Sequence, residues 1–403
     1  WLFWGAMGCG PTPSDQTPVP VTRTSLSVME PAAQADAEID EEAPVSLIRV
    51  ALLSLPNTFD PALFENPSAF VLGFTLYDSL VWIDRTLTPQ PMLAAHWESS
   101  QNGRLWTFQL RRDVTFHHGA PFTAADVVYT LTRLLDPKLQ SSMGPVLNFI
   151  KEVKALDDYT VRFLLHTPVA DLPLLLGTPQ TSIIPHDYAL PQLLTRPVGT
   201  GPFRFDELVP GEHLTLVRNA EYWEAERITI NELEYIRIDS FTAQVSALMQ
   251  DEVDLLLDID VDVIGQLTEN PDTMVMETPS GRYQNLAMRV NGPPFSDNRV
   301  RQALKACIDR NVLQQIWQGR SKMGNDHPIS PISPFFTDLP PTPPDLAKAR
   351  QLLADAGYPT GLQLQLLTAD AAPGMVKLAY AVQTMAQPAG IADGHAQRIA
   401  VAG

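Results

Sequence analysis

The sequence predicts an α/β protein with more than one domain. Short runs that alternate apolar and polar residues, or that are continuously apolar, recur between longer stretches with helical periodicity. The 403 residues are enough for two or three domains. A hydrophobic fraction of 45% and a mean hydropathy of −0.05 are typical of a soluble globular protein.

The charge excludes one large class of function. The formal net charge is −18, whereas nucleic-acid binding depends on Lys and Arg side chains that meet phosphates. An acidic balance fits a secreted or surface protein that self-repulsion keeps soluble. The 36 prolines exceed the roughly 20 expected at about 5% usage, so we expect loops to join the elements.

The N-terminal stretch resembles an export signal. Residues 1–8 form an apolar run too short to span a bilayer, with no initiating Met and no basic segment, so we expect the sequence to begin inside a signal peptide. Gly8-Cys9 resembles the end of a bacterial lipobox, which predicts lipidation of Cys9. Ala6 stands where Leu is usual, so an ordinary signal-peptidase site remains the alternative. The Pro-, Ser- and Thr-rich, then acidic, residues 10–44 are typical of a disordered tether.

The first elements have local signals. Residues 46–53 (SLIRVALL) predict a strand that leads into a turn-forming segment at 57–61. A helix is expected at 70–80. At 105–110, Trp, Phe and Leu alternate with Thr and Gln, which predicts a half-buried strand.

A turn and a capped helix follow. His118-Gly119 ends the preceding pattern, and Thr123 lies three residues before Asp126, a capping-box arrangement. Asp136-Pro137 stops the helix. Its apolar face is formed by Val127, Leu131, Leu134 and Leu135.

The middle of the chain continues the alternation. We expect a strand at 161–165, a short helix at 171–176, a strand at 233–238 and a helix at 242–249. The continuous apolar run at 253–257 predicts a buried parallel strand.

The last third has the same character. Residues 282–288 alternate, which predicts a strand, and 297–310 have a helical apolar stripe. A helix from 347 ends at Gly357 and Pro359, and a strand at 362–367 and a helix at 376–385 follow.

Several contiguous motifs together resemble one family. They are LWTFQLRRDVTFHHGAPFTAADVVYTLTRLLDP (105–137), YDSLVWID (77–84), PMLAAHWE (91–98), GTGPFRF (199–205) and LVRNAEYWE (216–224). Over residues 46–391 the chain resembles family 5 extracellular solute-binding proteins, the peptide, dipeptide and nickel receptors of ABC importers. The resemblance implies a type II (cluster C) periplasmic-binding-protein fold, with two α/β lobes joined by crossing strands, an inserted subdomain and an incomplete second lobe.

The resemblance also predicts a domain layout. The similarity stops past Ile391, so we expect a truncated or frame-shifted record. The predicted parts are a signal remnant, lipobox and tether at 1–45, lobe one at 46–60 and 180–285, the inserted subdomain at 61–179, a partial lobe two at 286–391 and a non-matching tail at 392–403.

The function implied is capture of a short peptide in the cleft between the lobes and delivery to an ABC permease, with ATP hydrolysis in separate subunits. We expect an extracytoplasmic monomer that is held at the membrane only by its lipid anchor, is not an enzyme and needs no cofactor. The residues expected to line the cleft are Asn57, Phe59, Thr200, Tyr283, Gln284 and Asn285. Alternatives are a family member that binds a nickel chelate, haem or an oligosaccharide, a non-functional truncated remnant, and an unrecognised hydrolase.

Two patterns could suggest metal sites. Asp258-x-Asp260-x-Asp262 with Glu269 resembles a Ca²⁺ loop, but Val263 replaces the required glycine, so a short helix capped by Asp260 or Asp262 is favoured.

The pair His117-His118 with Asp126 is better explained as a polar turn. The sequence contains no H-E-x-x-H, G-x-S-x-G or phosphate-loop pattern. Cys9 and Cys307 do not form a disulfide framework, and Cys307 is expected to be a buried, inert thiol.

Overall fold

The computed structural model describes residues 46–398, apart from 279, 325, 327–328, 332, 334, 370–371 and 394–396. Cys9 and the predicted tether therefore lie outside the described residues, as does the end of the predicted tail. None of the helices in the described part is both long enough and apolar enough to cross a membrane.

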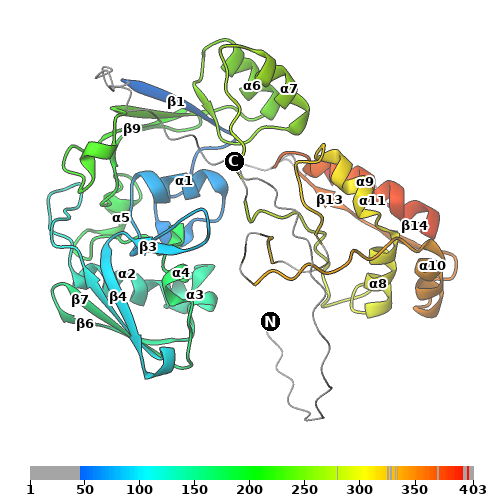
Figure 1. Cartoon of the computed structure of the whole chain (residues 1–403), viewed down its shortest axis with the longest axis horizontal. Helices are drawn as coiled ribbons and strands as arrows, with labels where there is room; N and C mark the ends of the chain where they lie inside the picture. Colours follow the sequence, from blue (N-terminus) through cyan, green and yellow to red (C-terminus); the bar gives the residue numbers. More distant parts are fainter. Residues whose placement is uncertain are drawn as a thin grey trace, which may run out of the picture. The chain divides into compact units, whose positions relative to one another are not determined.

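The first sheet joins distant parts of the chain. Its strand order is β11-β1-β10-β9-β8, with β1 parallel to β10 and β11 and the other pairs antiparallel. Figure 1 shows β1 in blue beside the green strands of the same sheet. The strands are β1 (Leu47–Leu52), β8 (Phe203–Val209), β9 (His213–Arg218), β10 (Glu232–Arg237) and β11 (Leu255–Leu256). The predicted strands at 46–53 and 233–238 are thereby confirmed.

For the apolar run at 253–257, the predicted parallel pairing is confirmed, but the predicted burial is not. Leu255 pairs in parallel with Val50, as expected. However, β11 lies at the edge of the sheet, and Leu255 and Leu257 are exposed. The prediction that the whole run is buried is wrong, because a continuous apolar run does not reveal whether both faces of a strand are covered.

A second sheet is antiparallel throughout, in the order β4-β5-β7-β6. Its strands are β4 (Ala94–Ser100), β5 (Leu105–Leu110), β6 (Ile150–Asp157) and β7 (Thr160–Leu165). Trp106, Phe108 and Leu110 are buried in alternation, which confirms the predicted pattern. Helix α2 (Ala124–Leu134) packs its apolar face into the same core.

The capping box of α2 is confirmed. Oδ2 of Asp126 accepts from the Thr123 backbone N–H at 2.8 Å and from its hydroxyl at 3.1 Å. Oδ1 accepts from the backbone N–H of His186 at 2.9 Å and lies 2.7 Å from its ring Nδ1. The buried Asp126 carboxylate thus both begins the helix and joins it to a segment 60 residues later.

The helix predicted at 70–80 is displaced: α1 spans Pro67–Thr75. Asn66 caps it by accepting from the N–H of Ala69 at 2.8 Å, and Pro67 occupies the first turn. An Asn-Pro start signal therefore decides the N-terminus, and the chain leaves the helix before Tyr77.

Smaller elements complete this part of the chain. The predicted helices at 171–176 and 242–249 are confirmed. A short helix, α7, also follows Asp260. The elements are β2 (Val81–Ile83), β3 (Pro89–Pro91), α3 (Met143–Val146), α4 (Leu172–Leu175), α5 (Leu190–Leu193), α6 (Phe241–Met249) and α7 (Ile264–Glu269).

In the described part of residues 298–398, four further helices and four short strands follow. Helices α8 and α10 lie side by side (Figure 1) and share a small core with Ile391. Burial raises the pKa of the Cys307 thiol to about 11, which fits an inert side chain. The predicted strand at 362–367 is divided into two. The elements are α8 (Asn298–Cys307), α9 (Arg310–Ile316), α10 (Leu346–Asp355), α11 (Met375–Ala386), β12 (Leu362–Leu364), β13 (Leu367–Thr368), β14 (Ile391–Asp393) and β15 (Gln397–Arg398).

The strand predicted at 282–288 is wrong: the chain is irregular there. Leu286 and Met288 do turn toward the core around α8, as the alternation suggests. Alternation predicts which side chains share a face, but a strand also needs a hydrogen-bonded neighbour. No such neighbour is found among the described residues.

Candidate functional site

The loop after β1 presents one exposed residue on a fixed base. Asn57 is exposed, whereas Phe59 is buried with its ring edge-on to Phe205 at 5.5 Å between centroids. The carbonyl of Phe59 accepts from the hydroxyl of Tyr77 at 2.6 Å. The contacts of Phe59 therefore anchor the loop to the protein. Of Asn57 and Phe59, only Asn57 is accessible to a ligand.

Asp60 closes the same loop. It accepts from the N–H of Ala62 at 3.1 Å and caps a 3-10 turn, Pro61–Leu63. Both of its oxygens accept from the guanidinium of Arg133, which comes from α2. Sequence reasoning placed Asp60 in a turn and missed Arg133, since no local signal connects residues 73 positions apart.

The Gly199–Phe203 loop packs tightly against the chain that follows α1. A Cβ on Gly199 would lie 2.0 Å from the carbonyl oxygen of Leu76, and one on Gly201 would lie 2.5 Å from the carbonyl carbon. The N–H of Gly201 donates to that oxygen at 3.1 Å. These glycines therefore allow a close backbone approach, and their partner is the segment at 75–77.

Thr200 points inward. It is 1% exposed, and its hydroxyl donates to Oδ2 of Asp78 at 2.9 Å. The residue thus fixes the glycine loop, and in this arrangement its hydroxyl is already used.

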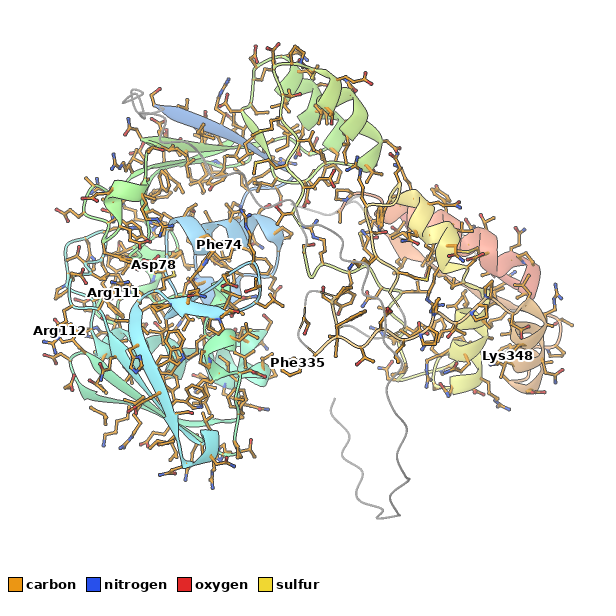
Figure 2. The ribbon with its side chains drawn as sticks, in the orientation of Figure 1. Phe74, Asp78, Arg111, Arg112, Phe335 and Lys348 are labelled. Atoms are coloured by element: carbon orange, nitrogen blue, oxygen red, sulfur yellow. The ribbon has the colours of Figure 1, made fainter. Side chains whose placement is uncertain are left out.

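Asp78, which is labelled in Figure 2, is buried and accepts hydrogen bonds from two other side chains. Its Oδ1 accepts from the hydroxyl of Tyr222 at 3.2 Å, and the neighbouring Trp223 ring lies 3.9 Å from the guanidinium carbon of Arg111. Burial raises the pKa of Asp78 to about 6, although the hydrogen bonds from Thr200 and Tyr222 oppose this shift.

His117 holds the other side of the glycine loop. Its Nδ1 accepts from the N–H of Gly199 at 3.2 Å, and its Nε2 lies 3.0 Å from the carbonyl oxygen of Gly201. This arrangement requires the neutral ring with its proton on Nε2. Burial lowers the pKa of His117 to about 4. Both ring nitrogens are used, so His117 is a turn residue, as predicted, that also positions the loop.

The third expected contact region is Tyr283, Gln284 and Asn285, and all three are exposed. The Nε2 of Gln284 donates to the carbonyl of Pro373 at 3.1 Å. The structure joins the Phe59 and Thr200 loops through residues 76–78, whereas the hydrogen bond of Gln284 within the described part of the chain is to Pro373. The binding roles of the six residues stay predictions.

The acidic run at 258–262 has protein partners. Asp260 caps a 3-10 turn, Val261–Val263, which confirms the capped-helix interpretation. The ammonium of Lys377 bridges Asp260 at 2.8 Å and Asp262 at 2.5 Å, and Arg282 pairs with Asp258 at 2.8 Å. Within the part of the chain that the structure describes, no cluster of three or more His, Cys, Asp and Glu side chains could hold a metal ion.

An open groove of about 1160 Å³ runs along α2 and β6. Its walls are mainly apolar, and none of the six expected ligand residues lines it. Among its lining residues are Val128, Tyr129, Arg133, Val153 and His186. The groove therefore shares no residue with the predicted ligand site.

A sequence profile described as bacterial extracellular solute-binding proteins, family 5 middle, matches residues 88–392, more than half of the chain. The protein belongs to this family. Heme-binding protein A of Haemophilus influenzae is 31% identical over 337 residues, 76% of this chain and 61% of that protein. Glutathione-binding protein GsiB of Pectobacterium atrosepticum is 26% identical over 335 residues, 80% of this chain and 64% of that protein. The chain spans about three fifths of the length of these family 5 relatives.

Solved family 5 structures agree. The periplasmic binding protein DppA from Helicobacter pylori, in complex with the peptide STSA, has a TM-score of 0.77 at 28% identity, covering 88% of this chain and 73% of that one. NikZ from Campylobacter jejuni, in complex with Ni(L-His), has a TM-score of 0.77 at 22% identity, covering 89% and 74%, and supports the fold alone. The fold is the type II periplasmic-binding-protein fold of cluster C, as the resemblance implied.

Proposed function

We propose that this family 5 protein captures short peptides outside the cytoplasm and delivers them to an ABC permease. The proposal rests on one observation: residues 76 and 77 are hydrogen-bonded to both the loop at 57–60 and the loop at 199–201. Tyr77 bonds the Phe59 carbonyl, while its neighbour Leu76 accepts from Gly201. Two segments 140 positions apart are thus held on one short frame before any ligand arrives, which lowers the ordering cost of binding.

The chemistry of the exposed residues suits a peptide. The side chains of Asn57, Gln284 and Asn285 can donate to and accept from backbone amides without net charge, and Tyr283 adds an apolar face with a polar tip. Bonds to peptide backbone give affinity with little side-chain discrimination. The DppA structure with the peptide STSA supports this ligand class.

The remaining roles follow from the same proposal. Cys9 carries a lipid that holds a monomeric receptor at the outer face of the membrane, and ATP hydrolysis belongs to separate subunits. The protein acts by binding, without a cofactor and without catalysis. Ligand that contacts both lobes shifts the population toward the closed form, which the permease recognises.

Haem is a second candidate ligand, and one observation favours it. Phe74 on α1 and Trp82 on β2 are 47% and 44% exposed, with ring centroids 5.8 Å apart. Phe74 lies in the last turn of α1, four residues before Asp78, and both residues are labelled in Figure 2. The two rings meet edge to face, with an interplanar angle of 82°, and form an exposed apolar patch. The relative at 31% identity is named for haem binding.

Calorimetric titration separates these ligands. We expect the peptide STSA to bind with a micromolar Kd, roughly −8 kcal/mol, and Asn57→Ala to weaken it. Asn231→Ala, which removes another exposed amide, is the matched control. Saturable haem binding that Trp82→Ala abolishes, with no heat from peptides, would favour haem. Cleavage of a peptide library would indicate a hydrolase, and no binding of any ligand would indicate a remnant.

A further inference from the structure

We propose that Arg133 is a positioning residue for the ligand, acting through Asp60 on the loop that presents Asn57. The inference deepens the proposed function and rests on it. It assigns the inserted subdomain, to which Arg133 is predicted to belong, a part in the binding site, although none of the six expected ligand residues lies within 61–179.

The ion pair between Arg133 and Asp60 fixes the orientation of the Asp60 carboxylate. Nη1 of Arg133 donates to Oδ1 of Asp60 at 2.8 Å, and Nη2 donates to Oδ2. The side chains are 13% and 4% exposed. A planar guanidinium that meets both carboxylate oxygens fixes the direction of the carboxylate as well as its position. A lysine can supply the charge but not this two-point geometry.

Asp60 transmits that constraint to the loop. Its backbone N–H donates to Oγ1 of Thr58 at 3.1 Å, so the orientation of Asp60 sets the turn that places Asn57. The Tyr77 hydroxyl holds the carbonyl of Phe59 between them. Without Arg133 the buried carboxylate is left uncompensated, and it gains most by turning toward water. That movement displaces the turn.

The first measurement needs no ligand. Amide hydrogen exchange of the peptide segment at 54–60 is compared in wild type, Arg133→Ala and Arg133→Lys. We expect faster exchange at residues 57–60 in both variants, with the lysine variant closer to wild type. Arg49→Lys is the matched control, because Arg49 also meets both oxygens of an aspartate, Asp254.

The second measurement is binding of the peptide STSA by calorimetry. Arg133→Lys is expected to weaken binding about 2- to 30-fold, the range for residues that act on a ligand without contacting it. In an Asn57→Ala background the same substitution should change the Kd no further, because the displaced group is already absent. If Arg133 only stabilises the fold, its substitution would lower the melting temperature in both backgrounds. The effects of the two substitutions on the Kd would then be additive.

The outcomes are distinct. Exchange at 57–60 that is unchanged in both Arg133 variants overturns the inference, even if those variants melt at a lower temperature. Additive effects of Arg133→Lys and Asn57→Ala on the Kd also overturn it. If the wild-type protein binds neither the peptide STSA nor other short peptides, the proposed function fails, and the exchange measurement still decides whether Arg133 positions the loop.

Discussion

Replacing His117 by glutamine tests how the glycine loop is held. The neutral ring accepts from Gly199 and donates to Gly201, and protonation of Nδ1 would destroy the first of these bonds. Burial, which disfavours the charged ring, lowers the pKa of His117 from 6.5 to about 4 in the folded protein. Glutamine can still donate to Gly201 but does not titrate.

The sign and the size follow from linkage. Between pH 6.5 and about 4 the unfolded chain binds a proton at His117 that the folded chain does not, so acid favours unfolding in that range. At 1.36 kcal/mol for each pH unit, the contribution of His117 to the free energy of unfolding falls by about 3 kcal/mol as the pH drops through this window. His117→Gln lacks this contribution.

Urea unfolding at pH 4 to 7 measures the effect. The stability advantage of wild type over His117→Gln should shrink by about 3 kcal/mol from pH 7 to pH 4. Every other titrating group is common to both proteins and cancels in the difference. A difference that does not vary with pH would mean that folding does not favour the neutral ring of His117, which would contradict the reasoning.

Three further predictions concern stability. Burial raises the pKa of Asp78 from 3.8 to about 6, so the stability of wild type relative to Asp78→Asn should fall by about 3 kcal/mol as the pH rises through that window; urea unfolding of both proteins at pH 4 and 7 measures this difference. Thr123→Ala should cost about 1 kcal/mol of unfolding free energy and leave peptide selectivity unchanged; lost selectivity at unchanged stability would contradict its role as a cap. Gly201→Ala would place a Cβ 2.5 Å from Leu76 and should cost about 1–3 kcal/mol in thermal unfolding. Gly265→Ala, with nothing within 4 Å, should cost nothing.

Local signals were reliable where neighbours in sequence decide the outcome. The alternation at 105–110 became β5, and Thr123 with Asp126 began α2, because side-chain period and capping involve residues within one or two turns. The missed Asn66-Pro67 start of α1 was also a local signal, and it could have been found.

Predictions that required knowledge of a neighbouring strand were less reliable. The run at 253–257 is an edge strand, partly exposed, and 282–288 is irregular despite its alternation. Both patterns describe the side chains of one segment. The cover on each face and the hydrogen-bonded partner come from other segments.

The sequence by itself determined the family, because contiguous motifs such as that at 105–137 can be recognised without knowledge of any tertiary contact. The GTGPFRF motif at 199–205, which contains Gly199 and Gly201, is another. Only the tertiary structure decided that these two glycines approach Leu76, that Thr200 turns inward to Asp78, and that Arg133 meets Asp60. The physical reason is that these contacts join residues 73 to 125 positions apart, where the packing of whole elements, rather than local propensity, chooses the partners.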